Sequence, residues 1–267
     1  MHRRTFIKNT GIIGGAVLAS PLLKAFPNNF ENAPYTLMDL HVHFTESFTI
    51  EMIMELAQKR NVKIGIVEHP ADWALKNDED LKSYITKLRQ YPVFIGLQPL
   101  TSGWTSRFSP ELLKQIDYVL MDPQTIPLPN GDYERIYELS CYIDDSEAFM
   151  ERYMNHSLNI LRNEPITIFG WPLFLPVCIA REYYELWTKK RMTQIIEAAA
   201  ARKIAIEIND MAHTPHEKFI LMAKEAGLKF TFGSDSRNNN VGRLVYCKSI
   251  AEKCKLTSDD FYIPGKS

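Results

Sequence analysis

The sequence predicts an α/β fold, a TIM-like barrel of about seven β-α units that forms a single domain over residues 36–267. Short apolar runs alternate with amphipathic stretches along this segment, and no hairpin signal separates the predicted strands. Strict alternation of strands and helices is typical of a parallel sheet, and this many repeats favours a closed barrel. The alternative, a doubly wound open sheet, is disfavoured because no glycine-rich phosphate loop follows the first strand.

Seven apolar segments are expected to form the barrel strands, at residues 36–42, 62–70, 93–100, 117–123, 166–172, 204–210 and 229–236. Amphipathic segments predict helices at residues 49–61, 78–91, 109–116, 185–203, 215–227 and 242–254. Ser109 and Pro110 mark the start of the third helix, and Gly227 marks the end of the fifth. An insertion around residues 125–165 contains a turn at "PNGD" and at least one long helix.

The charge balance bears on the class of partner. The chain of 267 residues has 31 basic and 32 acidic residues, a formal net charge of −1. No basic surface suited to nucleic acid is therefore expected, and the predicted partner is a small-molecule substrate. The four cysteines show no zinc-type pairing, and we expect all of them to be buried thiols.

The N-terminal segment resembles a twin-arginine export signal. Arg3 and Arg4 precede a glycine-containing apolar run that is too short for a comfortable membrane span. We therefore interpret residues 1–27 as a leader read by the twin-arginine export machinery, and residues 28–35 as a linker. The expected location is the periplasm, or the membrane surface if the leader is retained.

Polar side chains gather at the ends of the predicted strands, where the site of a β/α barrel is built. Asp39, His41 and His43 alternate along the first strand, so we expect all three to project from one face. Other strand ends supply further ionisable candidates, namely Glu68, His69, Glu207, Asp235 and Arg237. Imidazole and carboxylate groups together form ligand sets for Zn, Mn or Fe, so one or two divalent ions are expected.

Four motifs, "MDLHVHF", "IGIVEHP", "AIEIND" and "FTFGSDSRNNNVGR", resemble in order and spacing those of the PHP (polymerase and histidinol phosphatase) superfamily. This resemblance covers nearly the whole chain after the leader, and it implies a distorted seven-stranded β/α barrel with up to three metal ions. Most members of that family are phosphoesterases. By resemblance, His41 and His43 bind a first metal, His69 binds another, and Asp235 completes the cluster. Independently of the resemblance, Glu68 at the end of the second strand is a further candidate ligand.

The chain also departs from the family pattern. Gln98 stands where the family usually has a bridging glutamate, and Asp122 or Gln124 stands where it has a histidine. Trp171 occupies the histidine position of "GHP", and Arg237 replaces the histidine of the last motif. These replacements predict one or two ions rather than a full trinuclear centre.

The replacements suggest roles of their own. An arginine beside a metal suits an anionic substrate, which Arg237 can grip with two parallel hydrogen bonds. His213 follows the sixth strand and is a candidate general acid or base, and Glu207 is a further candidate catalytic residue. Trp171 is expected to pack in the barrel rather than to stack on a sugar ring.

The leading hypothesis is an exported metal-dependent hydrolase of the phosphoesterase type, with a metal-activated water at the C-terminal mouth of the barrel. Two alternatives stay open. One is an amidohydrolase-like or lyase activity on a small or sugar-derived substrate. The other is a degenerate barrel that binds a ligand without catalysis.

Overall fold

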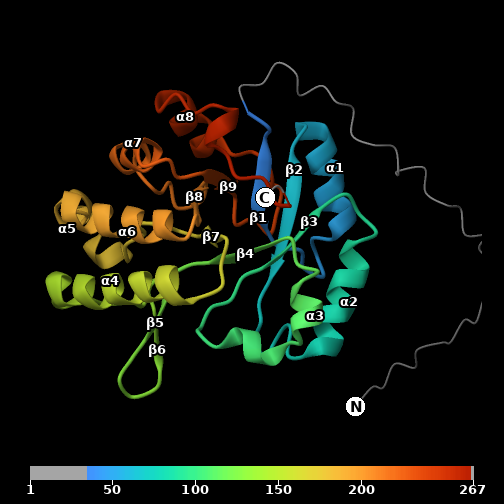
Figure 1. The fold of residues 1–267 in the computed structure, drawn as a ribbon, viewed down its shortest axis with the longest axis horizontal. Coiled ribbons are helices and arrows are strands. Elements are labelled where there is room, and N and C mark those ends of the chain that lie inside the picture. Colours follow the sequence, from blue (N-terminus) through green and yellow to red (C-terminus); the bar gives the residue numbers. More distant parts are fainter. Residues whose placement is uncertain (1–34, 266–267) are drawn as a thin grey trace, which may run out of the picture.

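The computed structural model describes residues 35–265, so the predicted leader at 1–27 and nearly all of the linker at 28–35 lie outside the described residues. Its central feature is a sheet of seven parallel strands (Figure 1). In spatial order these are β1 (Met38–Val42), β2 (Lys63–Glu68), β3 (Phe94–Leu97), β4 (Tyr118–Met121), β7 (Ile168–Phe169), β8 (Ala205–Asn209) and β9 (Phe230–Gly233). Each lies within a segment predicted to be a strand.

The sheet curves until its first and last strands meet. All neighbouring pairs in it are parallel. Val42 and Ser236 form a parallel bridge, and the His43 amide donates to the Ser236 carbonyl oxygen at 3.1 Å. The fold is therefore α/β with a nearly closed, TIM-like barrel of seven strands, as the alternation predicts.

Helices flank the barrel, with α1, α2 and α3 on one side in Figure 1 and α4, α5, α6 and α7 on the other. Several begin where a side chain caps the first turn. Thr49 accepts a hydrogen bond from a backbone amide of α1, and Asn77 and Asp145 do the same for α2 and α4, respectively. The α-helices are α1 (Ile50–Arg60), α2 (Asp78–Leu88), α3 (Pro110–Leu113), α4 (Ser146–Asn163), α5 (Tyr183–Leu186), α6 (Lys189–Ala201), α7 (Glu217–Glu225) and α8 (Val245–Lys253). Short 3-10 turns are η2 (Trp104–Arg107), η3 (Val177–Glu182) and η4 (Ser258–Asp260).

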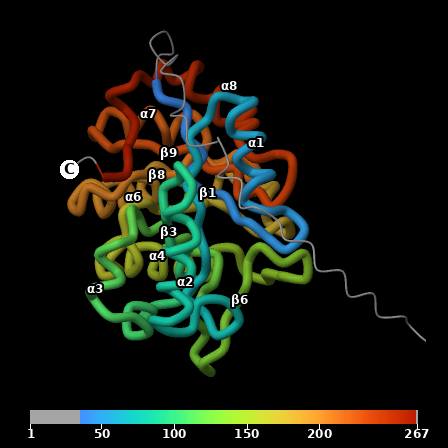
Figure 2. The backbone as a smooth tube through the Cα atoms, turned by 90° about the vertical axis from the view of Figure 1, so that its right-hand side faces the viewer, coloured from blue at the N-terminus to red at the C-terminus, as the bar shows by residue number. Residues whose placement is uncertain are grey.

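The insertion after β4 contains more regular structure than the sequence predicts. Its turn at "PNGD" is present, with the Leu128 amide donating to the Asp132 carbonyl oxygen at 2.8 Å. That turn joins two antiparallel strands that the sequence does not predict, β5 (Thr125–Pro127) and β6 (Tyr133–Arg135). The hairpin projects from the body of the protein in both views (Figures 1 and 2), and α4 is the long helix that follows it.

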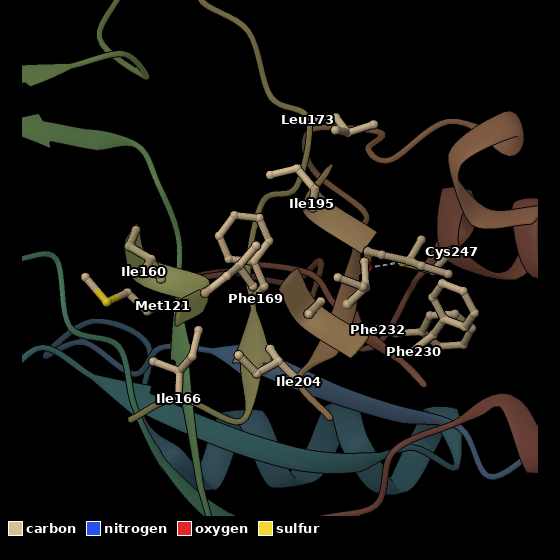
Figure 3. Packing of buried hydrophobic residues seen from close by; sticks show 14 of the residues in the cluster. Met121, Ile160, Ile166, Phe169, Leu173, Ile195, Ile204, Phe230, Phe232 and Cys247 are labelled. Atoms are coloured by element: carbon tan, nitrogen blue, oxygen red, sulfur yellow. Dashed lines mark hydrogen bonds between the residues drawn. The ribbon is translucent and has the colours of Figure 1, made fainter. Parts of the chain in front are cut away.

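Alternation along the strands separates two buried layers. The outer layer packs strands against helices, and Figure 3 shows part of it, with Met121 and Phe169 near Ile160 and with Phe232 near Phe230 and Cys247. The inner layer fills the barrel itself, and it consists of Met38, Leu40, Val67, Tyr118, Leu120, Ile168 and Ala205. The barrel is thus a packed core rather than a pore.

Tyr118 crosses the barrel interior and decides which residues fit around it. Its hydroxyl donates to the Leu40 carbonyl oxygen at 2.8 Å, so the buried polar group is satisfied. A Cβ at Gly65 would lie 2.5 Å from the tyrosine oxygen, and one at Gly96 would lie 2.4 Å from Cζ of the ring. These two strand glycines therefore make room for the ring, at some cost in strand propensity.

Two further observations concern residues 35–265. No helix in this range combines the length and the apolar character needed to cross a bilayer. Cys247 and Cys254 are buried thiols as expected, but Cys178 is exposed and Cys141 is only half-buried, so the expectation of four buried thiols is wrong for those two. Cys141 lies in an irregular segment and Cys178 in the short 3-10 turn η3, where the strand and helix patterns of the sequence do not indicate burial.

We predict that Gly96→Ala destabilises the protein by about 1–3 kcal/mol, because the added methyl overpacks the ring of Tyr118. Combining it with Tyr118→Leu is expected to cost less than the sum of the two single substitutions, since the smaller side chain removes the clash. Urea denaturation of the four proteins of this double-mutant cycle measures the coupling. Additive effects would contradict the packing described here.

Candidate metal centre

Five predicted residues come together at the C-terminal ends of β1, β2 and β9. They form two groups of three residues, and within each group the potential ligand atoms lie within 4.8 Å of one another. The first group is His41, His43 and Asp235, and the second is His43, Glu68 and His69. His43 belongs to both, so the two groups are continuous.

Two ligand separations in the first group match those around a tetrahedral ion. Asp235 Oδ1 lies 3.4 Å from His41 Nε2 and 3.3 Å from His43 Nε2. Ligands bonded to zinc at about 2.0–2.1 Å stand about 3.3–3.4 Å apart along the edge of a tetrahedron. Both Nε2 atoms are buried without a hydrogen-bond partner in the described chain, and such orphaned groups call for an explanation. A bound cation would explain both.

Glu207 fixes the orientation of His41. The His41 Nδ1 atom lies 2.7 Å from Glu207 Oε1, so this nitrogen donates its proton to the carboxylate and Nε2 is the ring atom left to act as a ligand. The other carboxylate oxygen accepts from the Trp171 amide at 2.7 Å and from Asn209 Nδ2 at 3.2 Å. Both Glu207 and His41 are 0% exposed, so this carboxylate does not reach the solvent.

His69 is oriented by the backbone of β3 in the same way. Its Nδ1 lies 2.9 Å from the Gln98 carbonyl oxygen, which leaves Nε2 available as a ligand. The His69 amide donates to Glu68 Oε1 at 2.8 Å, and this holds the half-buried carboxylate beside the ring. The rings of His43 and His69 stack with their centroids 5.1 Å apart.

The electrostatics of the cluster favour one added positive charge. Burial alone would lower the pKa of His41, but the carboxylates of Asp235 and Glu207 outweigh it and raise that pKa to about 9. Burial lowers the pKa of His43 to about 3 and that of His69 to about 4, so both imidazoles are neutral near pH 7. Burial alone would raise the pKa of Asp235, but His41 and His43 hold it well below its usual range. His43, His69 and the ionised carboxylate of Asp235 are thus in the protonation states that metal binding needs, whereas His41 would have to give up its Nε2 proton when an ion binds.

Asp39 departs from the prediction that it projects with His41 and His43. The register of β1 against β2 shifts between Asp39 and Val42, and this irregularity reverses the alternation within the strand. Asp39 instead accepts from the amides of Ser234 at 2.9 Å and Gly242 at 2.8 Å. Burial raises its pKa to about 6. It joins β1 to the segments around β9 and belongs to neither ligand group.

Arg237 lies at the rim of the first group. Its Nη1 donates to Asp235 Oδ1 at 2.8 Å, the same oxygen that faces the two Nε2 atoms. The arginine side chain is 45% exposed, whereas that of Asp235 is 10% exposed. Asp235 also has a φ of 46°, a left-handed conformation that is strained for a residue other than glycine. The chain therefore turns sharply where this carboxylate enters the site.

The family positions that differ in this chain are engaged in other contacts. Gln98 Nε2 donates to Asp122 Oδ2 at 2.9 Å, and the Gln124 amide donates to Asp122 Oδ1 at 3.0 Å. Trp171 is 6% exposed and packs edge-on against Phe174, with centroids 5.0 Å apart, in agreement with the packing expected for it. None of these residues enters either ligand group.

His213 lies apart from both ligand groups. It is exposed, and its ring stacks on Tyr246 with centroids 4.9 Å apart. The sequence places it just after β8, but the following loop carries it to α8, to which Tyr246 belongs. The structure does not bring this candidate acid or base to the ligand cluster.

Trp73 is a site neighbour that the sequence analysis missed. Its ring lies 4.9 Å from that of His69, and the side chain is 67% exposed. The available signal is weak: a single aromatic residue in the polar loop that follows "VEHP". An aromatic residue in a polar loop, a few positions from a candidate ligand, is the sequence pattern that indicates such a neighbour.

Comparisons with known proteins place this chain in no family. Neither a scan against protein-family models nor a search of curated proteins finds a match. The resemblance to the PHP superfamily therefore stays a prediction, and the geometry of the site carries the functional argument.

We predict that Glu207→Gln weakens zinc binding by about tenfold to a hundredfold, because the amide holds the His41 ring less firmly in the required tautomer. Competition with a chromophoric chelator measures this affinity. Glu164→Gln is the matched control, since Glu164 is a buried acid at the end of α4 that belongs to neither ligand group. Equal zinc affinity in a folded Glu207→Gln protein would contradict the assignment.

Proposed function

We propose that this protein is a metal-dependent hydrolase of the phosphoesterase type, exported by the twin-arginine route. One observation carries the proposal: two buried Nε2 atoms without a hydrogen-bond partner in the described chain each lie at a tetrahedral ligand spacing from the same carboxylate oxygen of Asp235. The twin-arginine pattern at Arg3 and Arg4 supports export.

The residues divide into those that hold an ion and those that orient the ligands. His41, His43 and Asp235 would hold a first divalent ion, and Glu68 with His69 would complete a second position that shares His43. Such an ion would supply Lewis acidity toward a water molecule and a substrate oxygen. Glu207 and the Gln98 carbonyl oxygen keep the imidazoles of His41 and His69 in the ligating tautomer.

Arg237 supports an anionic substrate. Only Nη1 makes a hydrogen bond in the described chain, to Asp235, so other guanidinium N–H groups stay available at the rim. A planar guanidinium matches the oxygens of a phosphate group, and its positive charge offsets the negative charge of a phosphoester near the carboxylates.

A second candidate function is ligand binding without catalysis. Gln98 and Trp171 occupy positions where the resembling family has ligands, and both are committed to contacts within the barrel. These contacts favour a reduced centre of one or two ions.

An amidohydrolase-like or lyase activity is a further alternative. A substrate screen with amide, lactone and phosphoester compounds separates it from the leading proposal.

We predict that the protein purified without added metal contains close to one equivalent or more of Zn, Mn or Fe. His43→Ala is expected to lose most of this metal and any phosphoester hydrolysis, because His43 belongs to both ligand groups. Elemental analysis and a screen of phosphate esters measure the two properties, with His216→Ala as control, a half-buried histidine outside both groups. Less than about a tenth of an equivalent, not restored by soaking, would contradict a metal centre.

A second prediction concerns Arg237. Arg237→Gln is expected to raise the affinity for zinc several-fold, because it removes a positive charge from the ligating oxygen of Asp235. The same substitution should weaken inhibition by inorganic phosphate by about tenfold, since it removes charge-assisted hydrogen bonds. Arg237→Lys keeps the charge but lacks the planar fork, so its inhibition by phosphate should be intermediate between that of the parent protein and that of Arg237→Gln. Unchanged phosphate inhibition would remove Arg237 from the anion site.

A further inference from the structure

The four tryptophans of the chain differ sharply in exposure. Trp104, Trp171 and Trp187 are each at most 6% exposed, whereas Trp73 is 67% exposed. A large indole ring exposed to water loses the favourable burial that usually places tryptophan inside. Its position therefore calls for an explanation.

The loop that carries Trp73 is held firmly, so its exposure does not come from a loose segment. The Leu75 amide donates to the His69 carbonyl oxygen, and the Ala71 amide donates to that of Leu75, both at 3.1 Å. Leu75 itself is buried and anchors the loop. The side chain of Asp72, next to the tryptophan, pairs with Arg107 at 2.6 Å. The fold thus presents the indole at the surface in a fixed position.

The position of the ring is next to the candidate metal centre. Trp73 contacts the ring of His69 at 4.9 Å between centroids, with the planes tilted by 52°. His69 in turn stacks on His43, which belongs to both ligand groups. One imidazole therefore separates the exposed indole from the shared ligand.

We propose that Trp73 forms a subsite for a carbohydrate ring, and that the substrate is a phosphorylated sugar; this rests on the proposed function for its phosphate end. The face of an indole ring is electron-rich and attracts the C–H groups on one face of a sugar ring. The phosphate of such a substrate would lie toward Arg237 and the candidate ligands, while the ring rests on Trp73. Trp73 then sets specificity and takes no part in the chemical step.

The surroundings of Trp73 favour a sugar over an aromatic group. In the described chain, its only ring contact is with His69, so no second aromatic side chain forms an opposing wall. Asp72, which precedes Trp73 in the sequence, has a side chain that is 86% exposed and pairs with Arg107, so this loop also carries a charged group at the surface. A single aromatic platform in a polar loop suits a ring that is apolar on its face and polar at its edge.

Steady-state kinetics of Trp73→Ala and Trp73→Phe on three phosphate esters tests the proposal. With glucose 6-phosphate, Trp73→Ala should raise KM by about five- to tenfold, and Trp73→Phe should raise it less. With glycerol 3-phosphate, which has no ring, both variants should stay within about twofold of the parent protein. Equal effects on these two esters, or no effect on either, would overturn the subsite, and a loss confined to 4-nitrophenyl phosphate would overturn the sugar assignment.

Fluorescence separates failure of this inference from failure of the proposed function. Trp73 is the indole that a soluble quencher reaches most easily, since the other three are buried. Glucose 6-phosphate should protect the protein from acrylamide quenching, and Trp73→Phe should show little protection, because only buried indoles remain. Protection without hydrolysis would keep the subsite and reject the hydrolase. Hydrolysis of glucose 6-phosphate without protection, and with normal kinetics in Trp73→Ala, would reject the subsite alone.

Discussion

The hydrogen bond between His41 Nδ1 and Glu207 Oε1, 2.7 Å long and closed to solvent, is the contact on which the candidate site depends. It joins the first strand of the barrel to the sixth, and it is shielded from the competition of water. Gly233 makes it possible, because a Cβ there would lie 1.9 Å from Glu207 Oε1 and 2.7 Å from His41 Cβ. The glycine of "GSDS" is therefore required by the packing of this pair. The Trp171 amide and Asn209 complete the partners of the carboxylate.

The solvent exposure of the side chains increases from this buried contact toward the rim of the site. His41 and His43 are at most 3% exposed, while Arg237 and Trp73 stand at the rim, where their side chains meet the solvent. Attraction between an ion and its ligands is stronger where water is excluded, because the charges are weakly screened. Recognition of an anion and of a sugar ring, as proposed above, would instead require an accessible surface. The buried His43 and the exposed Trp73 lie at opposite ends of a short path of contacting rings through His69.

Much of the candidate ligand set follows from the strand pattern alone. In a parallel barrel the C-terminal ends of all strands meet at one rim, so His41, His69 and Asp235 are brought together although they are distant in sequence. Asp39 does not face the site with His41 and His43 as predicted, because a register shift in β1 reverses the alternation on which that prediction depends. His213 does not reach the ligand cluster either, because it lies on a loop, and the sequence pattern does not determine the path of a loop. The two strands of the hairpin after β4 were missed since each has three residues, too few to show a period.

The sequence by itself determined the alternating β-α order, the seven strand segments and the residues at their ends, because burial imposes a period of two or 3.6 on any regular element. Only the tertiary structure decided the tasks of those residues. Glu207 became a partner of His41 rather than a group facing substrate, because side-chain reach inside a closed barrel is set by its neighbours across the interior. Trp73 gained its place beside His69 in the same way, through backbone hydrogen bonds and an anchoring leucine whose geometry no periodic pattern contains. Contacts between distant residues depend on packing in three dimensions, and that information appears only when the chain is folded.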